Sequence, residues 1–426
     1  MEKRRTVTEI TDKVHRGNAV VVTAGELCDR VREGEEIPFE EVDVVTSATC
    51  GVMSGTFATL SFTVAERNVF ERAAQVSLNG VPAYVGPCPN ERLGIVDLIV
   101  YGPARRDESY GGGHLFHELV ARHEIEVTVK TDDGRQLETS TSLDRIPFAR
   151  LCSTRNAYKN YFAVVNARES EVRSIFSVRP LRGPFKELTF SGCGELNPLE
   201  KDPALATIGM GTKILLNGAE GMVIGTGTRS SPAKPNLMGI ADMHGMQREY
   251  LGGFRTSAGP EIWTSWAVPI PIVNEQVLAY TKKLDEEIPV EVVDVHTRSP
   301  VGELTYADLW REVSVQFDRS ACLDCETCRV AALCPTGAFD DQQKEVERER
   351  CFHCGTCLQV CAGMAFHGDM GVVTLGGTEV PVTLRQSDRK RAVKLAELLR
   401  QKILAGEFTL AEPVSPLTPH REGPER

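Results

Sequence analysis

Hydrophobic residues form short clusters along the first 290 residues of the chain. Apolar runs bounded by glycine and polar residues predict buried strands at 17–23, 42–46, 81–85, 93–101, 125–129, 212–216 and 221–224. Amphipathic stretches near the N-terminus, at 26–32 and at 115–122 predict helices among these strands. Strands that alternate with helices predict an α/β fold for this part of the chain.

The pattern changes after residue 267. Closely spaced prolines at 267–274 predict a break in regular structure, and helices are expected at 275–284 and 304–313. Two apolar runs flank Gly376 and Gly377, which predicts a hairpin over 371–384. A helix is expected from Ser387 to Gly406. Its apolar face holds Ala392, Leu395, Ala396, Leu399 and Ile403.

Chain length supports more than one folding unit, because 426 residues exceed the ~250–300 at which single cores stop growing. We predict five segments: a large α/β domain at 1–290, a linker at 291–312, a small α+β ferredoxin-like domain at 313–370, the hairpin and helix at 371–411, and a flexible tail at 412–426.

A net charge of −11 argues against a nonspecific nucleic-acid binder, because such proteins gather Lys and Arg on one face. No apolar run approaches the roughly 20 residues of a membrane span, and the first residues lack the apolar core of an export signal. We therefore expect a cytoplasmic protein whose partners are proteins or small molecules.

Cysteine spacing is the most specific signal in the sequence. Eight of the thirteen cysteines lie between residues 322 and 361, and the spacing C-x2-C-x2-C occurs twice. This spacing supplies three thiolates to an iron–sulfur cubane, and in two-cluster ferredoxins the fourth ligand comes from the other half of the motif. The predicted ligand sets are Cys322, Cys325, Cys328 and Cys361 for one [4Fe-4S] cluster, and Cys351, Cys354, Cys357 and Cys334 for the other.

The segment departs from the bacterial ferredoxin pattern at two points. Five residues instead of three separate Cys328 from Cys334, and Ala362 instead of proline follows Cys361. Neither change removes a ligand. A zinc ribbon also uses paired C-x2-C motifs, but two full triplets and Pro335 after Cys334 favour iron–sulfur clusters. Such clusters carry electrons, so the fused large domain is the nearest redox partner.

Four cysteines of the large domain are candidates for chemistry. Cys50 follows a predicted strand at the start of a Gly/Ser-rich turn, where exposed backbone N–H groups can lower a thiol pKa. Cys193 and Cys88 lie between glycines or prolines, which predicts exposed turns, and Cys152 precedes Arg155. A buried, inert thiol is the alternative for each, and Cys28 on a predicted helix is interpreted as structural.

His114 and His117 follow three glycines and share a helical face with Glu118. They could bind a metal or act as a base, but an ordinary half-exposed helix is favoured because no third ligand is evident.

An ordered series of short motifs resembles the homocysteine-biosynthesis sulfur-incorporation family. The motifs are VDVVTSATCG at 42–51 with Met53, NGVPAY at 79–84, GGGH at 111–114, RNAYKNY at 155–161, NPL at 197–199, TIGMGT at 207–212 and PIP at 269–271. With the eight-cysteine segment attached, the chain resembles the methanogenesis marker 16 metalloprotein family of methanogenic archaea. The resemblance implies a sulfurtransferase that uses cysteine persulfide chemistry and electrons from an iron–sulfur partner, as in the conversion of aspartate semialdehyde to homocysteine.

Two positions differ from that family's pattern. The relatives place a cysteine directly after the methionine of the Gly/Ser turn, where this chain has Ser54, and a second cysteine where it has Asp133. The nearest thiol to the first position is Cys50. The resemblance therefore leaves the sulfur donor and acceptor open.

Two functional hypotheses follow. In the first, the protein is a redox enzyme in which a large-domain cysteine carries persulfide sulfur to an electrophilic acceptor, and the clusters supply electrons. In the second, the protein is a non-catalytic electron-transfer or adaptor subunit of a methanogenesis enzyme or of its maturation machinery. Replacement of Cys50 distinguishes them, because only the first hypothesis requires that thiol.

Overall fold

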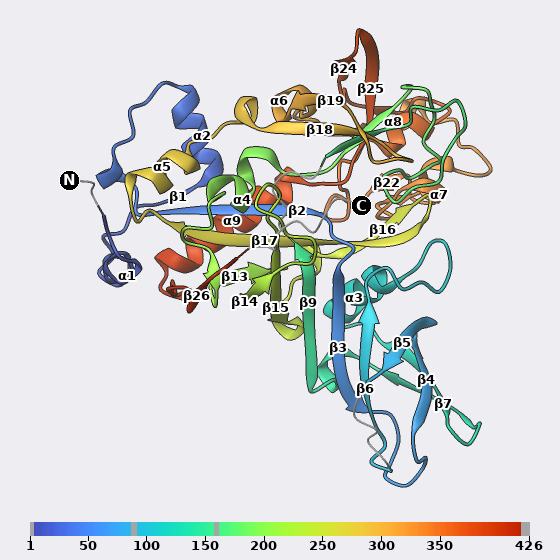
Figure 1. Ribbon diagram of the computed structural model, residues 1–426. Helices are drawn as coiled ribbons and strands as arrows, with labels where there is room; N and C mark the ends of the chain where they lie inside the picture. Colours follow the sequence, from blue (N-terminus) through green and yellow to red (C-terminus); the bar gives the residue numbers. More distant parts are fainter. Residues whose placement is uncertain (1–3, 87–91, 157–161, 419–426) are drawn as a thin grey trace.

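The computed structural model describes residues 4–86, 92–156 and 162–418, which form a mixed α/β fold around one long, mostly antiparallel sheet (Figure 1). The strand order is β1-β2-β17-β13-β14-β15-β9-β3-β6-β5-β4-β7-β8, and β16 pairs with β17. The strands are β1 Val21–Thr23, β2 Val44–Val52, β3 Thr56–Thr63, β4 Ala73–Leu78, β5 Val81–Val85, β6 Ile95–Tyr101, β7 Ile125–Thr131, β8 Gln136–Thr141, β9 Phe148–Asn156, β13 Lys213–Leu216, β14 Ala219–Thr226, β15 Leu237–Asp242, β16 Gly252–Thr256 and β17 Gly259–Pro271.

β2 and β17 form the longest strand pair of this sheet, next to its β1 edge, and are buried along nearly their whole length. The predicted break at 267–274 is wrong, because β17 continues to Pro271. The N–H of Ile272 donates to the Asp43 carbonyl at 2.9 Å, and in this register the N–H positions of residues 269 and 271 face away from β2. β13 pairs with β17 only at Trp266 and Ala267, so the two prolines leave no strand partner unsatisfied.

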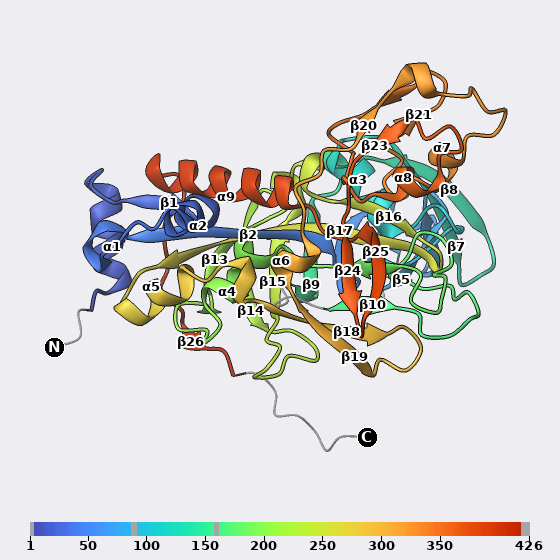
Figure 2. The same ribbon diagram turned by 90° about the horizontal axis from the view of Figure 1, so that it is seen from above.

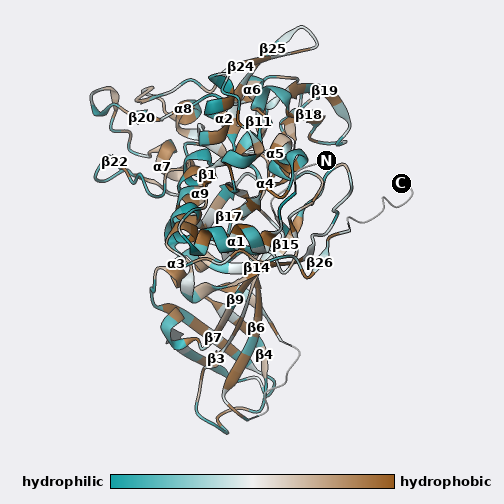
Figure 3. Cartoon of the chain, turned by 90° about the vertical axis from the view of Figure 1, so that its left-hand side faces the viewer, coloured by the Kyte–Doolittle hydropathy of each residue, from teal (hydrophilic) through white to brown (hydrophobic). Residues whose placement is uncertain are grey.

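Strands β3 to β9 bend away from the centre as a separate lobe (Figure 1). β3 alternates buried and half-buried residues, which is the pattern of a sheet with one covered face. Figure 3 shows hydrophobic residues along β3, β6, β7 and β9 of this lobe. The predicted strands at 81–85, 93–101 and 125–129 are confirmed as β5, β6 and β7.

A second sheet joins segments that are far apart in the sequence. Its order is β19-β18-β10-β11-β25-β24, and β10 pairs in parallel with β18 as β11 does with β25. The strands are β10 Ala163–Val165, β11 Leu188–Phe190, β18 Pro289–Asp294, β19 Pro300–Thr305, β24 Val372–Leu375 and β25 Thr378–Arg385. The expected linker at 291–312 therefore contributes β19, most of β18 and α6 Tyr306–Leu309 to one core with residues 163–190.

The helices cover the central sheet mainly at its β1 end. They are α1 Val7–His15, α2 Ala24–Arg32, α3 Gly112–Val120, α4 Pro198–Lys201, α5 Glu275–Thr281 and α9 Arg389–Leu404. Figure 2 shows α9 lying along β2, and its predicted apolar face is buried there. The predicted hairpin is confirmed as β24 and β25. In the part of the chain that the structure describes, no helix is long and apolar enough to cross a membrane.

The cysteine-rich segment projects from one end of the molecule (Figure 2). Its elements are β20 Gln316–Phe317, α7 Arg329–Leu333, β21 Phe339–Asp340, β22 Glu345–Val346, α8 Thr356–Val360 and β23 Phe366–His367. β20 pairs with β23 and β21 with β22. Phe317, Phe339 and Phe366 pack on one another at its centre.

Candidate functional site

A cavity of about 90 Å³, here called the inner cavity, lies where β2 ends. The end of β2 and the turn after it form one wall, the end of β9 a second, and the segments before β11 and α9 the rest. The lining residues are Thr49, Cys50, Gly51, Val52, Met53, Ser54, Arg155, Ile175, Phe176, Ser191, Gly192 and Gln386. The lining combines apolar side chains with hydroxyl-bearing residues and one arginine, and its volume suits a small molecule.

The fold brings Cys50 and Cys193 together at this cavity. The N–H of Cys50 lies 3.4 Å from the Cys193 Sγ, which donates to the Cys50 carbonyl at 3.4 Å. Both side chains are fully buried, and burial raises the pKa of both thiols above its usual range. The prediction of an exposed Cys50 with a lowered pKa is therefore wrong, because Cys50 lies inside β2 and the turn begins only after Val52.

The other candidate thiols of the large domain lie elsewhere. Cys193 is buried behind the cavity instead of lying in an exposed turn, and Cys152 is buried in β9, where burial raises its pKa to about 11. Cys88 lies outside the described residues. Cys28 is buried in α2 and accepts a hydrogen bond from Lys201 Nζ at 3.0 Å, which confirms its structural role.

His114 and His117 also serve the fold. The Nδ1 of His114 accepts from the Gly111 N–H at 3.2 Å, and burial lowers the pKa of this imidazole to about 3. The His117 Nδ1 lies 3.0 Å from the Leu251 carbonyl. Both histidines are half-buried, as expected for an ordinary half-exposed helix, and each hydrogen-bonds the backbone.

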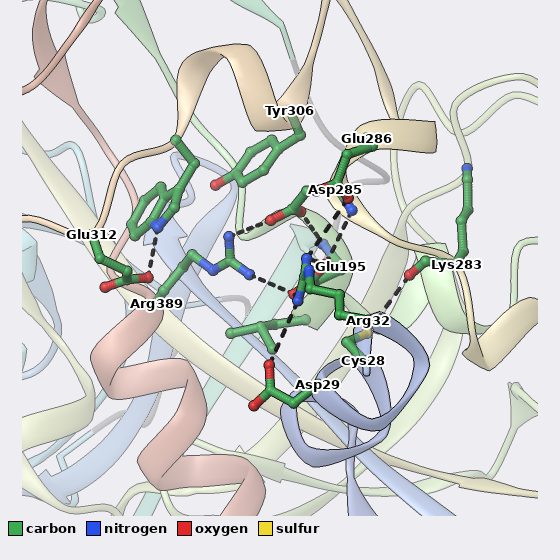
Figure 4. Close-up of polar contacts among 12 residues, drawn as sticks. Cys28, Asp29, Arg32, Glu195, Lys283, Asp285, Glu286, Tyr306, Glu312 and Arg389 are labelled. Atoms are coloured by element: carbon green, nitrogen blue, oxygen red, sulfur yellow. Dashed lines mark hydrogen bonds and ion pairs between the residues drawn. The ribbon is translucent and has the colours of Figure 1, made fainter. Parts of the chain in front are cut away.

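A buried ion network holds the segment that carries Cys193 (Figure 4). Arg389 at the start of α9 binds Asp285 at 2.6 Å and Glu195 at 3.3 Å, and Arg32 of α2 also binds Glu195. The Tyr306 hydroxyl donates to the carbonyl of Gly192. The network thus fixes residues on both sides of Cys193 to two helices and to α6.

We expect Arg389→Met to destabilise the protein by about 3–5 kcal/mol, because Asp285 would remain buried without its cation. Thermal or denaturant unfolding of the purified chain measures this change. Arg311→Ala is the matched control, since Arg311 pairs with Asp369 at the surface and should change stability by less than ~1 kcal/mol. Equal effects of the two substitutions would contradict the structural role of the network.

The eight clustered cysteines form two groups. Cys322, Cys325, Cys328 and Cys361 line one cavity of about 90 Å³, which Phe317, Phe339 and Phe366 also wall. The members of the second group lie close enough to affect one another. Burial and, after it, the charges of Cys334 and Cys351 raise the pKa of Cys354 to about 12. Burial and the charges of Cys354, Cys351 and Cys334 also raise the pKa of Cys357. The groups are therefore those that the crossed-over spacing predicts.

The two groups share a local motif. The N–H of Ala338 donates to Cys334 Sγ at 3.3 Å, and the N–H of Ala365 donates to Cys361 Sγ at 3.4 Å, four residues after the cysteine in each case. Within the described ranges, no three His, Cys, Asp or Glu side chains are grouped so that they could hold a metal ion. The four cysteines of the first group are among the residues that line one cavity.

The second cysteine group docks on the strand that carries Cys50. The Asp388 N–H donates to the Cys50 carbonyl at 3.0 Å, and the Asp388 carboxylate pairs with Arg391. Arg391 donates to the Cys351 carbonyl at 3.0 Å, and the N–H of Arg385 donates to the Cys354 carbonyl at 3.0 Å. A short chain of polar contacts thus connects the cysteine segment with the inner cavity.

Comparison with known proteins identifies the family. Residues 19–410 match the model of a family described as homocysteine biosynthesis enzyme, sulfur-incorporation. The chain belongs to this family. The match begins before β1 and ends after α9, so the matched range of this chain runs across the cysteine-rich segment.

Relatives in the sulfur-incorporation family come from methanogens. An uncharacterized protein of Methanothermobacter thermautotrophicus is 47% identical over 95% of this chain and 94% of its own length. An uncharacterized protein of Methanocaldococcus jannaschii is 42% identical over 92% of this chain and 98% of its own. The L-aspartate semialdehyde sulfurtransferase of Methanosarcina acetivorans is 33% identical over 74% of this chain, which spans 64% of that relative. No solved structure matches the chain.

Sequence reasoning missed Glu261, which lies beside Ser54. Ser54 lies in the turn after β2, and its hydroxyl hydrogen-bonds the Glu261 carboxyl. The glutamate is 5% exposed, and burial raises its pKa to about 7 despite the nearby Arg155 charge. A single acidic residue within the apolar run of β17 was the available signal.

We expect Glu261→Gln to stabilise the protein at pH 8. The carboxyl pKa is about 7 in the folded chain and ordinarily 4.5, so unfolding releases a proton between these values and stability falls as pH rises through this window. Glutamine does not titrate, so the gain over the native chain should reach at most about 3 kcal/mol at pH 8 and vanish near pH 4.5. Unfolding curves at both pH values measure it, and a pH-independent difference would contradict the raised pKa.

Proposed function

We propose that this chain is an iron–sulfur sulfurtransferase in which Cys50 carries a sulfur atom to an electrophilic carbonyl acceptor in the inner cavity. The observation that carries the proposal is that Cys50 has two neighbours of interest. It lines the inner cavity, and its carbonyl is connected with the Cys351 carbonyl through Asp388 and Arg391. Family membership supports sulfur incorporation as the reaction class.

The cysteine segment fits two [4Fe-4S] clusters. Cys322, Cys325, Cys328 and Cys361 would hold one, and Cys334, Cys351, Cys354 and Cys357 the other. A zinc ion draws four thiolates toward one point, whereas each cysteine of a cubane binds a different iron, so cubane ligands surround a volume. The cysteines of the first group line one cavity, which supports this assignment, and the N–H groups of Ala338 and Ala365 suit sulfurs that carry negative charge.

The clusters would supply single electrons at low potential. Release of the carried sulfur as Cys–S–SH + 2e⁻ + H⁺ → Cys–SH + HS⁻ breaks one S–S bond and needs two electrons, which two clusters can hold. The residues of this chain then have separate tasks. Cys50 carries the sulfur, Cys193 lies next to its backbone as a second thiol, and Asp388 with Arg391 fixes the strand against the cysteine segment.

An aldehyde is the acceptor class that we propose. Two relatives are named L-aspartate semialdehyde sulfurtransferase, and they are 33% and 31% identical to this chain. The inner cavity has the size of a small aldehyde, and Arg155 can pair with an acidic group on the same molecule.

Anaerobic purification tests both parts of the proposal. We expect about eight iron and eight sulfide per chain, as two cubanes require. After reaction with a sulfur donor, mass spectrometry should find a persulfide on Cys50, and Cys152 serves as the buried control thiol. Zinc in place of iron would overturn the cluster assignment. Full clusters with unmodified thiols and no consumption of an aldehyde would favour the non-catalytic electron-transfer or adaptor subunit, which the complete burial of Cys50 and Cys193 also allows.

A further inference from the structure

The register of β2 and β17 places Ser54 opposite Glu261. Val52 pairs with Trp263, and the N–H of Met53 donates to the Ile262 carbonyl at 2.9 Å. One more residue along each strand sets the first residue of the turn against the glutamate. The hydrogen bond between Ser54 and the Glu261 carboxyl agrees with this register. Their contact is therefore built into the longest strand pair of the fold.

The Glu261 carboxyl is buried without full compensation. Its Oε2 has no hydrogen-bond partner and lies out of contact with solvent. Leaving a buried carboxylate oxygen without a donor costs several kcal/mol, so such a group holds a proton or awaits a ligand. Arg155 at the end of β9 is the charged residue that acts on it. In β16, Phe254 pairs with Glu261. In α3, Gly113 lies against the Glu261 carbonyl, and the ring of His114 lies against Gly253.

Ser54 connects this buried carboxyl with two cavities. It lines the inner cavity, and it also lines an open cleft of about 1080 Å³ between β4, β5 and β6. The cleft carries Arg105 and Lys130 on its walls. Ser54 thus belongs to the walls of both the cleft and the inner cavity.

We propose that Glu261 and Ser54 form a proton relay to the acceptor: the Ser54 hydroxyl contacts the carbonyl oxygen of the bound aldehyde, and Glu261 supplies the proton through that hydroxyl. This inference rests on the proposed function. The net reaction is R–CHO + HS⁻ + 3H⁺ + 2e⁻ → R–CH₂–SH + H₂O, with a low-potential one-electron donor as the reductant. The C=O bond breaks, a C–S bond forms, and the oxygen leaves as water.

The proposed reaction needs a proton donor beside the inner cavity, and the relay would supply the proton. Hydroxide is a poor leaving group, so loss of the carbonyl oxygen requires protonation at the moment that the C–O bond breaks. The Cys50 and Cys193 side chains are fully buried, whereas Ser54 is half-buried and lines both cavities. A carboxyl that is protonated near neutral pH suits this role.

The first test is the pH profile of thiol formation from an aldehyde acid, with sulfide and a chemical reductant. The native chain should lose activity as pH rises above about 7, and this fall is called the alkaline limb of the profile. Glu261→Gln should lower the rate about 100-fold and remove the alkaline limb. Ser54→Ala should also lower the rate and remove the alkaline limb. Ser54→Thr keeps the hydroxyl and should keep the alkaline limb. Glu220→Gln, at an exposed glutamate of β14, is the matched control and should change nothing.

A second measurement does not depend on turnover. Infrared difference spectra should show a protonated carboxyl that titrates near pH 7 and is absent in Glu261→Gln. Aspartate semialdehyde should shift this band in the native chain and leave it unmoved in Ser54→Ala. No turnover by the native chain together with the band shift would overturn the proposed function and keep the relay. Turnover with an unchanged alkaline limb in Glu261→Gln, or a band that the aldehyde does not move, would overturn the relay alone.

Discussion

We expect Cys354→Ser to reduce the iron content from about eight to about four atoms per chain, because one of two cubanes would lose a ligand. The turnover that we propose should fall by at least about 100-fold, since even residues outside the ligand shell alter metal sites by 10–100-fold. Iron analysis and the thiol-forming assay on the same anaerobic preparation measure both effects.

The same substitution should also lower the melting temperature. Cys354 and its neighbour Phe352 belong to the main hydrophobic core, where Phe352 packs on Phe254 and Trp263. Arg385 and Arg391 bind the carbonyls of this loop. Loss of the second cluster would therefore loosen the junction between the cysteine segment and the large sheet.

Cys325→Ser provides the matched comparison within the first cysteine group. Cys325 is exposed and lies beside Leu323, at the end of the segment that is farther from the core. We expect it to lose the same amount of iron with a much smaller change in melting temperature. Cys152→Ser should retain all the iron. A native iron content in Cys354→Ser would overturn the ligand assignment, and equal melting shifts in the two ligand variants would contradict the docking role of the second group.

Local patterns in the sequence predicted the parts of the fold that depend on neighbours in the chain. The duplicated C-x2-C-x2-C spacing placed the eight cysteines in two groups, and the structure brings the first four to one cavity. The hairpin around Gly376 and the C-terminal helix follow from turn and capping residues, although the cap is Asp388 and not the predicted Ser387. In each case a few adjacent residues determine the backbone conformation.

Proline misled the prediction at β17. Prolines two residues apart usually end a strand. Here the N atoms of Pro269 and Pro271 point away from β2, to the side of β13, but β13 ends before it reaches them. The sequence around them gives no indication of where β13 stops. Strand neighbours that come from distant segments decided the outcome.

The candidate site depends on contacts across the chain. Cys193 contacts the Cys50 backbone, and the ion network of Arg389 helps to hold its segment beside β2. Glu261 reaches Ser54 because β2 and β17 pair over nine residues. A turn rich in glycine and serine also looked exposed from the sequence, but long-range packing buried the cysteine beside it. Such contacts cannot be inferred from spacing in a single sequence.

Replacement of Cys50 by serine should abolish the sulfur transfer that we propose while leaving the clusters intact. Removal of a reacting nucleophile lowers turnover by factors on the order of 10⁴ or more. Serine has nearly the size of cysteine, and the contacts of the Cys50 backbone with Asp388 and with the Cys193 thiol do not require its own sulfur. The fold and about eight iron per chain should therefore remain.

Cys193→Ser separates chemistry from packing at the same site. A serine hydroxyl can accept from the Cys50 N–H and donate to the Cys50 carbonyl as the thiol does, so a large loss of turnover in this variant would assign Cys193 a direct part in sulfur handling. A modest loss would leave Cys50 as the sulfur carrier. Cys152→Ser, at an equally buried thiol away from the inner cavity, should retain native turnover. If Cys50→Ser keeps native turnover with full clusters, the persulfide assignment fails, because Cys50 is the one thiol that lines the described inner cavity.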